Sequence, residues 1–155
     1  MIKPKKSLGQ NFLIDNNILK KIIEQTEIKN KNIVEIGPGT GNLTKKIIEK
    51  KKKNLILIEK DNILANSLQK KFEKLNNLKI FNEDILKFDL EKKLVSDTTI
   101  IGNLPYNISS QILIKLVKFE KWLPKYKKLI LMFQKEVADK ILAKFNTINY
   151  GRISI

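Results

Sequence analysis

Apolar residues are distributed along this chain in two alternating patterns. Short, mainly apolar runs occupy residues 33–36, 55–58, 78–81, 99–102 and 129–133. Runs of this length, rich in isoleucine, leucine and valine, are typical of strands buried on both faces. Between them lie longer segments whose apolar residues recur every three or four positions, which predicts amphipathic helices. Strands that alternate with helices predict an α/β fold with a parallel, doubly wound sheet and right-handed crossovers.

Each helical segment has an apolar side that we expect to face the sheet. These inward positions are Ile18, Leu19, Ile22 and Ile23; Leu43, Ile47 and Ile48; Ile63, Leu64, Leu68 and Phe72; Ile112, Leu113, Leu116 and Val117; and Val137, Ile141, Leu142 and Phe145. Asp15 and Asp61 directly precede two of the helical patterns, and a carboxylate there accepts hydrogen bonds from free backbone N–H groups. We therefore predict that both are N-caps.

A glycine turn follows the first predicted strand. Gly37, Gly39 and Gly41 stand between that strand and a helical pattern, which is the first unit of a nucleotide-binding sheet. The spacing is Gly-x-Gly-x-Gly rather than the Gly-x-Gly-x-x-Gly of dinucleotide-binding proteins, so a dehydrogenase is the less favoured interpretation. Glu59 ends the second strand roughly 20 residues later, where a carboxylate can accept hydrogen bonds from two ribose hydroxyls.

A second turn follows the run 99–102 and reads Asn103-Leu104-Pro105-Tyr106. In open α/β sheets, ligands bind outside the carboxyl ends of the strands, so this turn is predicted at the rim of the site. An amide there can bind an exocyclic amino group, and an aromatic ring can stack on a base. The alternative is a polar turn with Tyr106 as a core residue, and four residues alone do not separate the two hypotheses.

The composition narrows the possible chemistry and partners. The chain contains no cysteine and no histidine, which argues against disulfides, a thiolate metal site and a histidine base. Its formal net charge is +15, which favours a polyanionic partner, although a lysine-rich composition would produce the same excess. No apolar run approaches a membrane span and no signal-peptide core is visible, so we expect a cytoplasmic protein without a membrane partner.

The N-terminal stretch, residues 1–14, is predicted to be a basic arm. Lys3, Lys5 and Lys6 could contact phosphates, whereas the alternative is a frayed terminus.

Several motifs in order carry a family resemblance. The stretch 35–41, Glu-Ile-Gly-Pro-Gly-Thr-Gly, resembles motif I of class I S-adenosylmethionine-dependent methyltransferases, which have a Rossmann-like fold. The further motifs are Gly-Gln-Asn-Phe-Leu (9–13), Glu59, Asp84, Gly-Asn-Leu-Pro-Tyr-Asn-Ile-Ser-Ser (102–110), Gln-Lys-Glu-Val (134–137) and Tyr-Gly-Arg (150–152). Together they resemble the ribosomal RNA adenine N6,N6-dimethyltransferase family over essentially the whole chain, and within it the bacterial enzymes that act on small-subunit rRNA.

The resemblance implies a set of site residues. The implied binding residues for S-adenosyl-L-methionine are Gln10, Asn11, Leu13, Gly37, Gly39, Gly41, Glu59, Asp84, Ile85 and Asn103. The implied catalytic residues are Asn103, Leu104, Pro105 and Tyr106. In this scheme the arm 1–14 folds over the cofactor, Glu59 binds the ribose, and Asp84 accepts from the adenine amino group. Asn103 and a following backbone carbonyl hold the target amine, Tyr106 stacks on the base, and no metal ion takes part.

The resemblance also implies the substrate and the domain organisation. The expected substrate is two adjacent adenosines near the 3′ end of 16S rRNA in an immature small ribosomal subunit. Family members continue past the Tyr-Gly-Arg motif through further strands into a small helical domain. We therefore expect residues 1–155 to be one methyltransferase domain, incomplete at its C-terminus and monomeric when full length.

Three alternatives stay open at this point. One is a dimethyltransferase of the antibiotic-resistance type, acting on large-subunit rRNA. Another is a ribosome-assembly factor that binds RNA without catalysis. The third is a protein-glutamine methyltransferase, although those enzymes typically have Asn-Pro-Pro-Tyr where this chain has Leu104.

Overall fold

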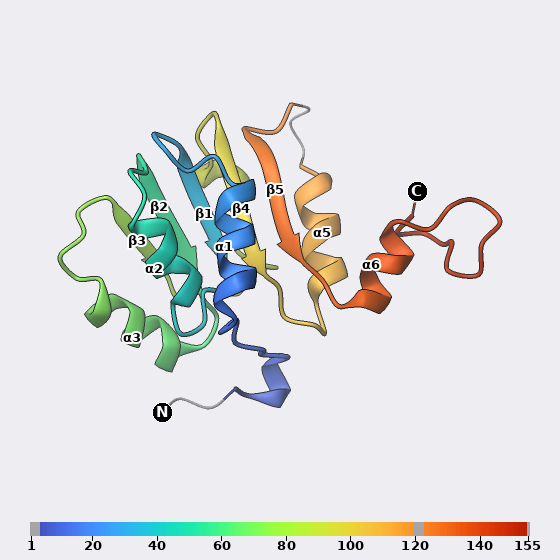
Figure 1. Ribbon diagram of the computed structural model, residues 1–155, viewed down its shortest axis with the longest axis horizontal. Helices are drawn as coiled ribbons and strands as arrows, with labels where there is room; N and C mark the ends of the chain where they lie inside the picture. The colour runs from blue at the N-terminus through green and yellow to red at the C-terminus, as the bar shows by residue number, and fades with distance from the viewer. Residues whose placement is uncertain (1–3, 120–122, 155) are drawn as a thin grey trace.

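The five predicted strands form a single parallel sheet in the computed structural model, which describes residues 4–119 and 123–154. The strands are β1 (Asn32–Ile36), β2 (Asn54–Ile58), β3 (Leu78–Phe81), β4 (Thr98–Asn103) and β5 (Tyr126–Met132). Their order is β3-β2-β1-β4-β5, and every neighbouring pair is parallel (Figure 1). The chain adds β2 and β3 on one side of β1 and then β4 and β5 on the other, so the strand order reverses between β1 and β4. In α/β sheets, ligands bind at such a point.

Helices connect the strands as the periodicity predicts. They are η1 (Lys6–Leu8), α1 (Asn16–Gln25), α2 (Asn42–Ile48), α3 (Asn62–Lys71), α4 (Leu90–Lys93), α5 (Ser109–Val117) and α6 (Lys135–Ile141). Asp15 and Asp61 are N-caps as predicted, because each side chain accepts two backbone N–H groups of the following helix. The short helices η1 and α4 were not predicted, since three or four residues are too few to show a helical period.

The hydrophobic core consists of two layers, one on each face of the sheet. Ile33 of β1 and Ile101 of β4 pack in the layer that α1, α2 and α3 cover. Their neighbours in the sequence, Val34 of β1 and Ile100 of β4, pack in the layer on the other face, which α4 and α5 cover. Successive strand residues point to opposite faces, so strands buried on both sides read as continuous apolar runs. The predicted doubly wound α/β fold is confirmed.

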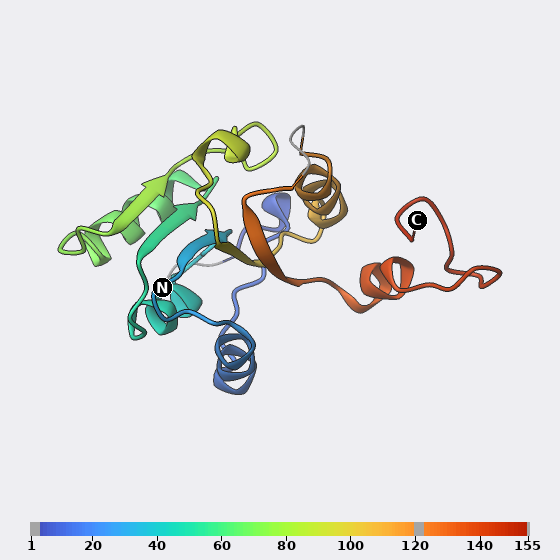
Figure 2. The ribbon, with the colours of Figure 1, turned by 90° about the horizontal axis from the view of Figure 1, so that it is seen from above.

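Some predicted inward positions are exposed, and those predictions were wrong. Ile18, Ile63 and Val117 lie at the margins of their helical stripes, where the helix surface turns away from the sheet. Leu142 and Phe145 are 78% and 73% exposed. Helix α6 buries none of its residues and projects away from the sheet (Figure 2). Periodicity shows which side of a helix is apolar, but it does not show whether another element covers that side.

Candidate functional site

Most of the predicted site residues meet at the carboxyl edge of the sheet. They line two small cavities that share Gly37, with volumes of about 90 Å³ and about 20 Å³. The residues of the predicted set in the larger cavity are Gln10, Gly37, Glu59, Asp84, Ile85 and Pro105. Those in the smaller cavity are Asn11, Leu13, Gly37, Gly39 and Asn103. Residues that are up to 95 positions apart in the chain are thus assembled at the edge where the strand order reverses.

Three residues of the predicted set do not line either cavity. Gly41 is the N-cap of α2 with φ +80, and an added Cβ would lie 2.8 Å from Leu68 Cδ2, so it serves close packing against α3. Leu104 is 2% exposed and belongs to the core, which leaves only its backbone for a ligand. Tyr106 lies beside the cavities, where its hydroxyl accepts a hydrogen bond from the side chain of Asn11.

Glu59 has its carboxylate held by the backbone of two turns. Gly39 N donates to Oε2 at 3.0 Å, and Asp61 N donates to Oε1 at 2.9 Å. Burial raises the pKa of Glu59 and outweighs these backbone hydrogen bonds, which act in the opposite direction. Each carboxylate oxygen can accept a second hydrogen bond, so the group retains the capacity to bind a ligand hydroxyl.

Asp61 and Asp84 are both held by lysines. Lys5 Nζ lies 2.7 Å from Asp61 Oδ2, and Lys60 Nζ lies 2.8 Å from Asp84 Oδ2. Burial opposes ionisation of Asp61, but hydrogen bonds from Lys5, backbone amides and Gln10 outweigh it and lower its pKa. The hydrogen bond from Lys60 lowers the pKa of Asp84. Both groups are therefore ionised at neutral pH, and Lys60 is a neighbour of the site that the sequence reasoning missed.

Glu35 is an acidic group buried beneath the smaller cavity, which it also lines. Its burial raises its pKa to about 8, although Thr44 Oγ1 donates to Oε2 at 2.7 Å and favours ionisation. The nearby carboxylate of Glu59 adds to the upward shift. Glu35 therefore stays protonated at neutral pH, and Thr44 is a second residue that the sequence reasoning missed.

The N-terminal arm lies against the site. Gln10 Nε2 donates to Asp61 Oδ2 at 3.3 Å, and Tyr106 N donates to the Gly9 carbonyl at 3.4 Å. Gly9 has φ +60, and an added Cβ would lie 2.5 Å from Asn107 Oδ1, so this approach needs a glycine. The sequence contains Gly9 within a motif, but only the structure shows what it contacts.

The structure describes the side chain of one of the three arm lysines. Lys5 was predicted as a candidate phosphate contact, and here it pairs with Asp61. Lys3 lies outside the described residues, and the side chain of Lys6 is not described either. A phosphate-binding role for the arm stays a prediction.

The arm also limits the space in the site. Its residues Ser7, Leu8 and Gln10 line the larger cavity, and Asn11, Phe12 and Leu13 line the smaller one. Pockets that bind small molecules usually have volumes of about 300–1,000 Å³, far more than either cavity. The arm therefore narrows the open space at this edge of the sheet.

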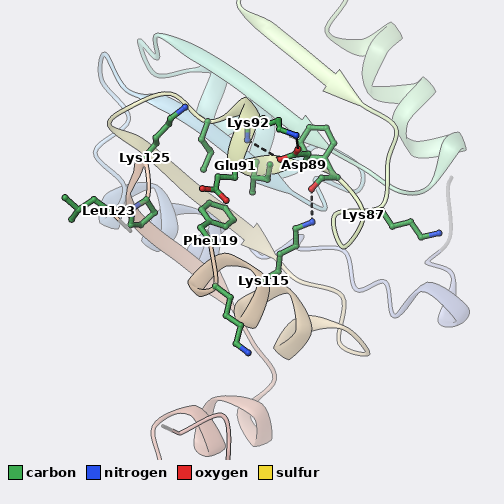
Figure 3. A pocket seen from close by; sticks show the side chains of 13 residues that line it. Lys87, Asp89, Glu91, Lys92, Lys115, Phe119, Leu123 and Lys125 are labelled. Atoms are coloured by element: carbon green, nitrogen blue, oxygen red, sulfur yellow. Dashed lines mark hydrogen bonds and ion pairs between the residues drawn. The ribbon is translucent and has the colours of Figure 1, made fainter. Parts of the chain in front are cut away.

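A much larger cavity lies elsewhere, between α4, the end of α5 and the segment before β5 (Figure 3). Its volume is about 820 Å³, and lysines surround it. Two of these have partners in the fold: Lys115 Nζ donates to the Leu86 and Phe88 carbonyls, and Lys92 pairs with Asp89 at 2.7 Å. None of the predicted site residues lines this cavity.

Neither a metal centre nor a membrane span is found in the part of the chain that the structure describes. Within residues 4–119 and 123–154, no group of three or more acidic, histidine or cysteine side chains could hold a metal ion. No helix within the same ranges is long and apolar enough to cross a membrane. The acidic side chains of the site accept hydrogen bonds from hydroxyl, amide and ammonium groups.

The sheet order, the glycine turn and the acidic strand ends define a class I, Rossmann-like methyltransferase fold. The structure resembles the crystal structure of a dimethyladenosine transferase from Plasmodium falciparum with a TM-score of 0.79 and 35% identity, covering 94% of this chain and 51% of that one. It also resembles the 23S rRNA methyltransferase ErmE with a TM-score of 0.72 and 27% identity, covering 84% and 50% of the two chains.

The sequence comparison identifies the family within that class. Residues 1–155 match the family described as ribosomal RNA adenine dimethylase, and the chain belongs to this family. It is 51% identical to ribosomal RNA small subunit methyltransferase A of Pelagibacter ubique (strain HTCC1062), covering 99% of this chain and 58% of the relative. The same protein of Mesomycoplasma hyopneumoniae (strain J / ATCC 25934 / NCTC 10110) is 50% identical, with 98% and 56% covered. The chain thus spans little more than half the length of these curated relatives.

Proposed function

We propose that this chain is the catalytic domain of an rRNA adenine N6,N6-dimethyltransferase that uses S-adenosyl-L-methionine and acts on 16S rRNA in the immature small subunit. The observation that carries the proposal is the position of Asn103. Its amide borders the smaller cavity, at the end of β4 and across from the glycine turn. Family membership and the small-subunit names of the relatives support the choice of substrate.

The residues of the two cavities fit S-adenosyl-L-methionine. Glu59 offers carboxylate oxygens to the ribose hydroxyls, and Asp84 offers an ionised acceptor to the adenine amino group. Gly37 and Gly39 have φ +66 and φ +59, which brings the backbone close to the space where the methionine part would lie. When bound, the cofactor supplies an electrophilic methyl group on a sulfonium.

The target amine needs help because its lone pair is delocalised into the adenine ring. Asn103 Nδ2 donates to the Asn11 carbonyl at 2.6 Å, so Oδ1 is the atom presented to a ligand. Oδ1 and the backbone carbonyl of Leu104 or Pro105 would accept the two amine hydrogens and favour a pyramidal nitrogen. Positioning of this kind can contribute about 7–11 kcal/mol, and it needs no histidine base.

Tyr106 would hold the target base after it leaves the RNA stack. Stacking of a base on an aromatic ring contributes about 1–3 kcal/mol. One proton leaves as each methyl group is added, and one N–H remains after the first transfer. The same acceptors can therefore serve a second transfer, which is why the proposal includes dimethylation.

The test is methyl transfer from labelled S-adenosyl-L-methionine to small subunits from cells that lack this modification. We expect label in 16S rRNA, recovered as N6,N6-dimethyladenosine by nucleoside mass spectrometry. Asn103→Ala should abolish the transfer, whereas Asn149→Ala, at an exposed position near the C-terminus, should not change it.

The other hypotheses correspond to other results of the same assay. Label in 23S rRNA would instead indicate an enzyme of the large-subunit type. Binding to the subunits without transfer, despite measurable cofactor binding, would indicate an assembly factor.

A further inference from the structure

Asn11 contacts both functional side chains of the turn that follows β4. Its backbone carbonyl accepts a hydrogen bond from Asn103 Nδ2 at 2.6 Å. Its side-chain Nδ2 donates to the hydroxyl of Tyr106. One arm residue thus holds both the amide of Asn103, the last residue of β4, and the ring of Tyr106, three residues later.

We propose that Asn11 is a positioning residue for the reaction, in addition to any contact that it makes with the cofactor. The proposal rests on the proposed function. Asn11 acts through its neighbours: its carbonyl fixes which end of the Asn103 amide faces the target amine, and its side chain fixes the Tyr106 ring.

The amide of Asn103 has two ends with opposite hydrogen-bonding character. Rotation by half a turn would exchange the acceptor Oδ1 for the donor Nδ2, and a donor cannot accept hydrogens from the target amine. The Asn11 carbonyl selects one orientation, because only the NH₂ end can donate to it. Docking of the arm therefore determines that Oδ1 of Asn103, and not Nδ2, faces the target amine.

The ring of Tyr106 is held at both of its ends. Pro105 restricts the backbone before it, and the bond from Asn11 fixes the hydroxyl at the far end. The ring would otherwise be free to change rotamer, because Tyr106 is only partly buried.

A role in stability explains these contacts poorly. Asn11 is exposed, and the bond to Tyr106 is not needed to satisfy a buried polar atom. Substitutions at Asn11 should therefore leave the fold intact and affect the geometry of the turn.

The geometry leads to a double-mutant cycle. Asn11→Leu keeps the approximate volume and removes the donor, and Tyr106→Phe keeps the ring and removes the acceptor. Each change should slow methyl transfer about fivefold, the effect of losing one hydrogen bond. The double variant should also be about fivefold slower, because both substitutions break the same bond. Asn16→Leu, the same exchange at an exposed position on α1, is the matched control and should have the wild-type rate.

A conservative variant provides a rescue test. Asn11→Asp cannot donate, but a tyrosine hydroxyl can donate to a carboxylate, so the contact can re-form with its direction reversed. We expect Asn11→Asp to be faster than Asn11→Leu in the wild-type background and to lose this advantage in Tyr106→Phe.

Hydrogen exchange of peptide 103–109 gives a second readout that does not depend on catalysis. Exchange should rise in either single variant and should not rise further in the double variant. If the wild-type chain transferred no methyl groups, the proposed function would fail, yet coupled exchange would still establish that Asn11 positions the turn. The inference would be overturned if the two substitutions acted independently, so that the increase in exchange rate in the double variant equalled the product of the increases in the single variants.

Discussion

The two ends of the described chain differ in how the rest of the protein holds them. The N-terminal arm lies along the carboxyl edge of the sheet, where it bonds to Asp61, Asn103 and Tyr106. The C-terminal segment, residues 134–154, carries exposed apolar side chains such as Leu142 and Ile148. Within the described residues, its side-chain hydrogen bonds join residues of the segment itself; for example, Ser154 Oγ donates to the Lys140 carbonyl at 2.5 Å.

This difference shows that apolar composition alone does not dock a segment. Hydrophobic burial needs a complementary face, and no element among residues 4–119 and 123–154 buries a residue of α6. In the arm, Leu13 packs against the core, and the hydrogen bonds have specific partners at the strand ends. Equivalent substitutions in the arm or the site that it contacts and in the C-terminal segment should therefore have very different consequences.

The largest contrast is expected between Glu59 and Glu136. Glu59→Ala removes a charged acceptor from the larger cavity, whereas Glu136→Ala changes an exposed residue of α6. Hydrogen bonds to charged groups contribute about 1.5–3 kcal/mol, so affinity for S-adenosyl-L-methionine should fall about 10- to 100-fold in the first variant. Calorimetric titration measures the affinity of each variant.

Glu59→Gln keeps the side-chain volume and removes the charge, so it separates the two contributions to the loss of affinity. Unchanged affinity in a folded Glu59→Ala variant would refute the ribose assignment.

The second contrast compares Tyr106 with Tyr150. Tyr150 packs edge-on against Phe145 at a centroid distance of 5.6 Å, within the C-terminal segment. Tyr106→Ala should slow methyl transfer tenfold or more, on the scale of about 1–3 kcal/mol for one stacked base. Tyr150→Ala should leave the rate unchanged. If Tyr106→Ala mainly lowers the melting temperature, the ring is a structural residue instead.

The third contrast compares two glycines. Gly9 has φ +60 and is crowded by Asn107, whereas a Cβ added to Gly151 would meet no atom within 4 Å. Gly9→Ala should release the arm at a strain of about 1–2 kcal/mol, which corresponds to about tenfold faster hydrogen exchange of residues 7–13. In the Gly151→Ala variant, amide hydrogen exchange should match that of the wild type at every residue. Equal protection of the arm in both variants would show that the arm is not held through Gly9.

The smallest effect concerns the buried acid of the site. Glu35 has a pKa of about 8 in the folded chain and about 4.5 when unfolded, so between these values only the unfolded chain releases the proton. The free energy of unfolding should therefore fall as the pH rises from about 4.5 to about 8, and then level off. Glu35→Gln does not titrate and can still accept from Thr44, so it should melt about 3 °C or more above the wild type at pH 8.

The control for this experiment lies in the C-terminal segment. Glu136→Gln, at an exposed position, should keep the pH dependence of the wild type. A Glu35→Gln variant with the same pH slope as the wild type would show that Glu35 is ionised in the folded state.

The sequence predicted where the candidate residues lie in the fold better than it predicted their contacts. Gly37, Glu59 and Asn103 line the cavities because strand ends and the turns after them can be recognised from local pattern. The roles of Gly9 and Lys60 could not be found this way. Their partners, Asn107 and Asp84, are distant in sequence, and no local pattern encodes which pairs the fold brings together.

The sequence by itself determined the alternation of strands and helices, the two N-caps and the glycine turn, because each depends on residues within one or two helical turns. Only the tertiary structure decided which apolar faces are buried. Ile63 and Leu64 are neighbours on α3, yet the first is 58% exposed and the second 1%. Only the tertiary structure, too, showed that the arm reaches Asn103 and Tyr106. These outcomes depend on long-range packing, in which a side chain's environment is set by elements that the sequence places far away.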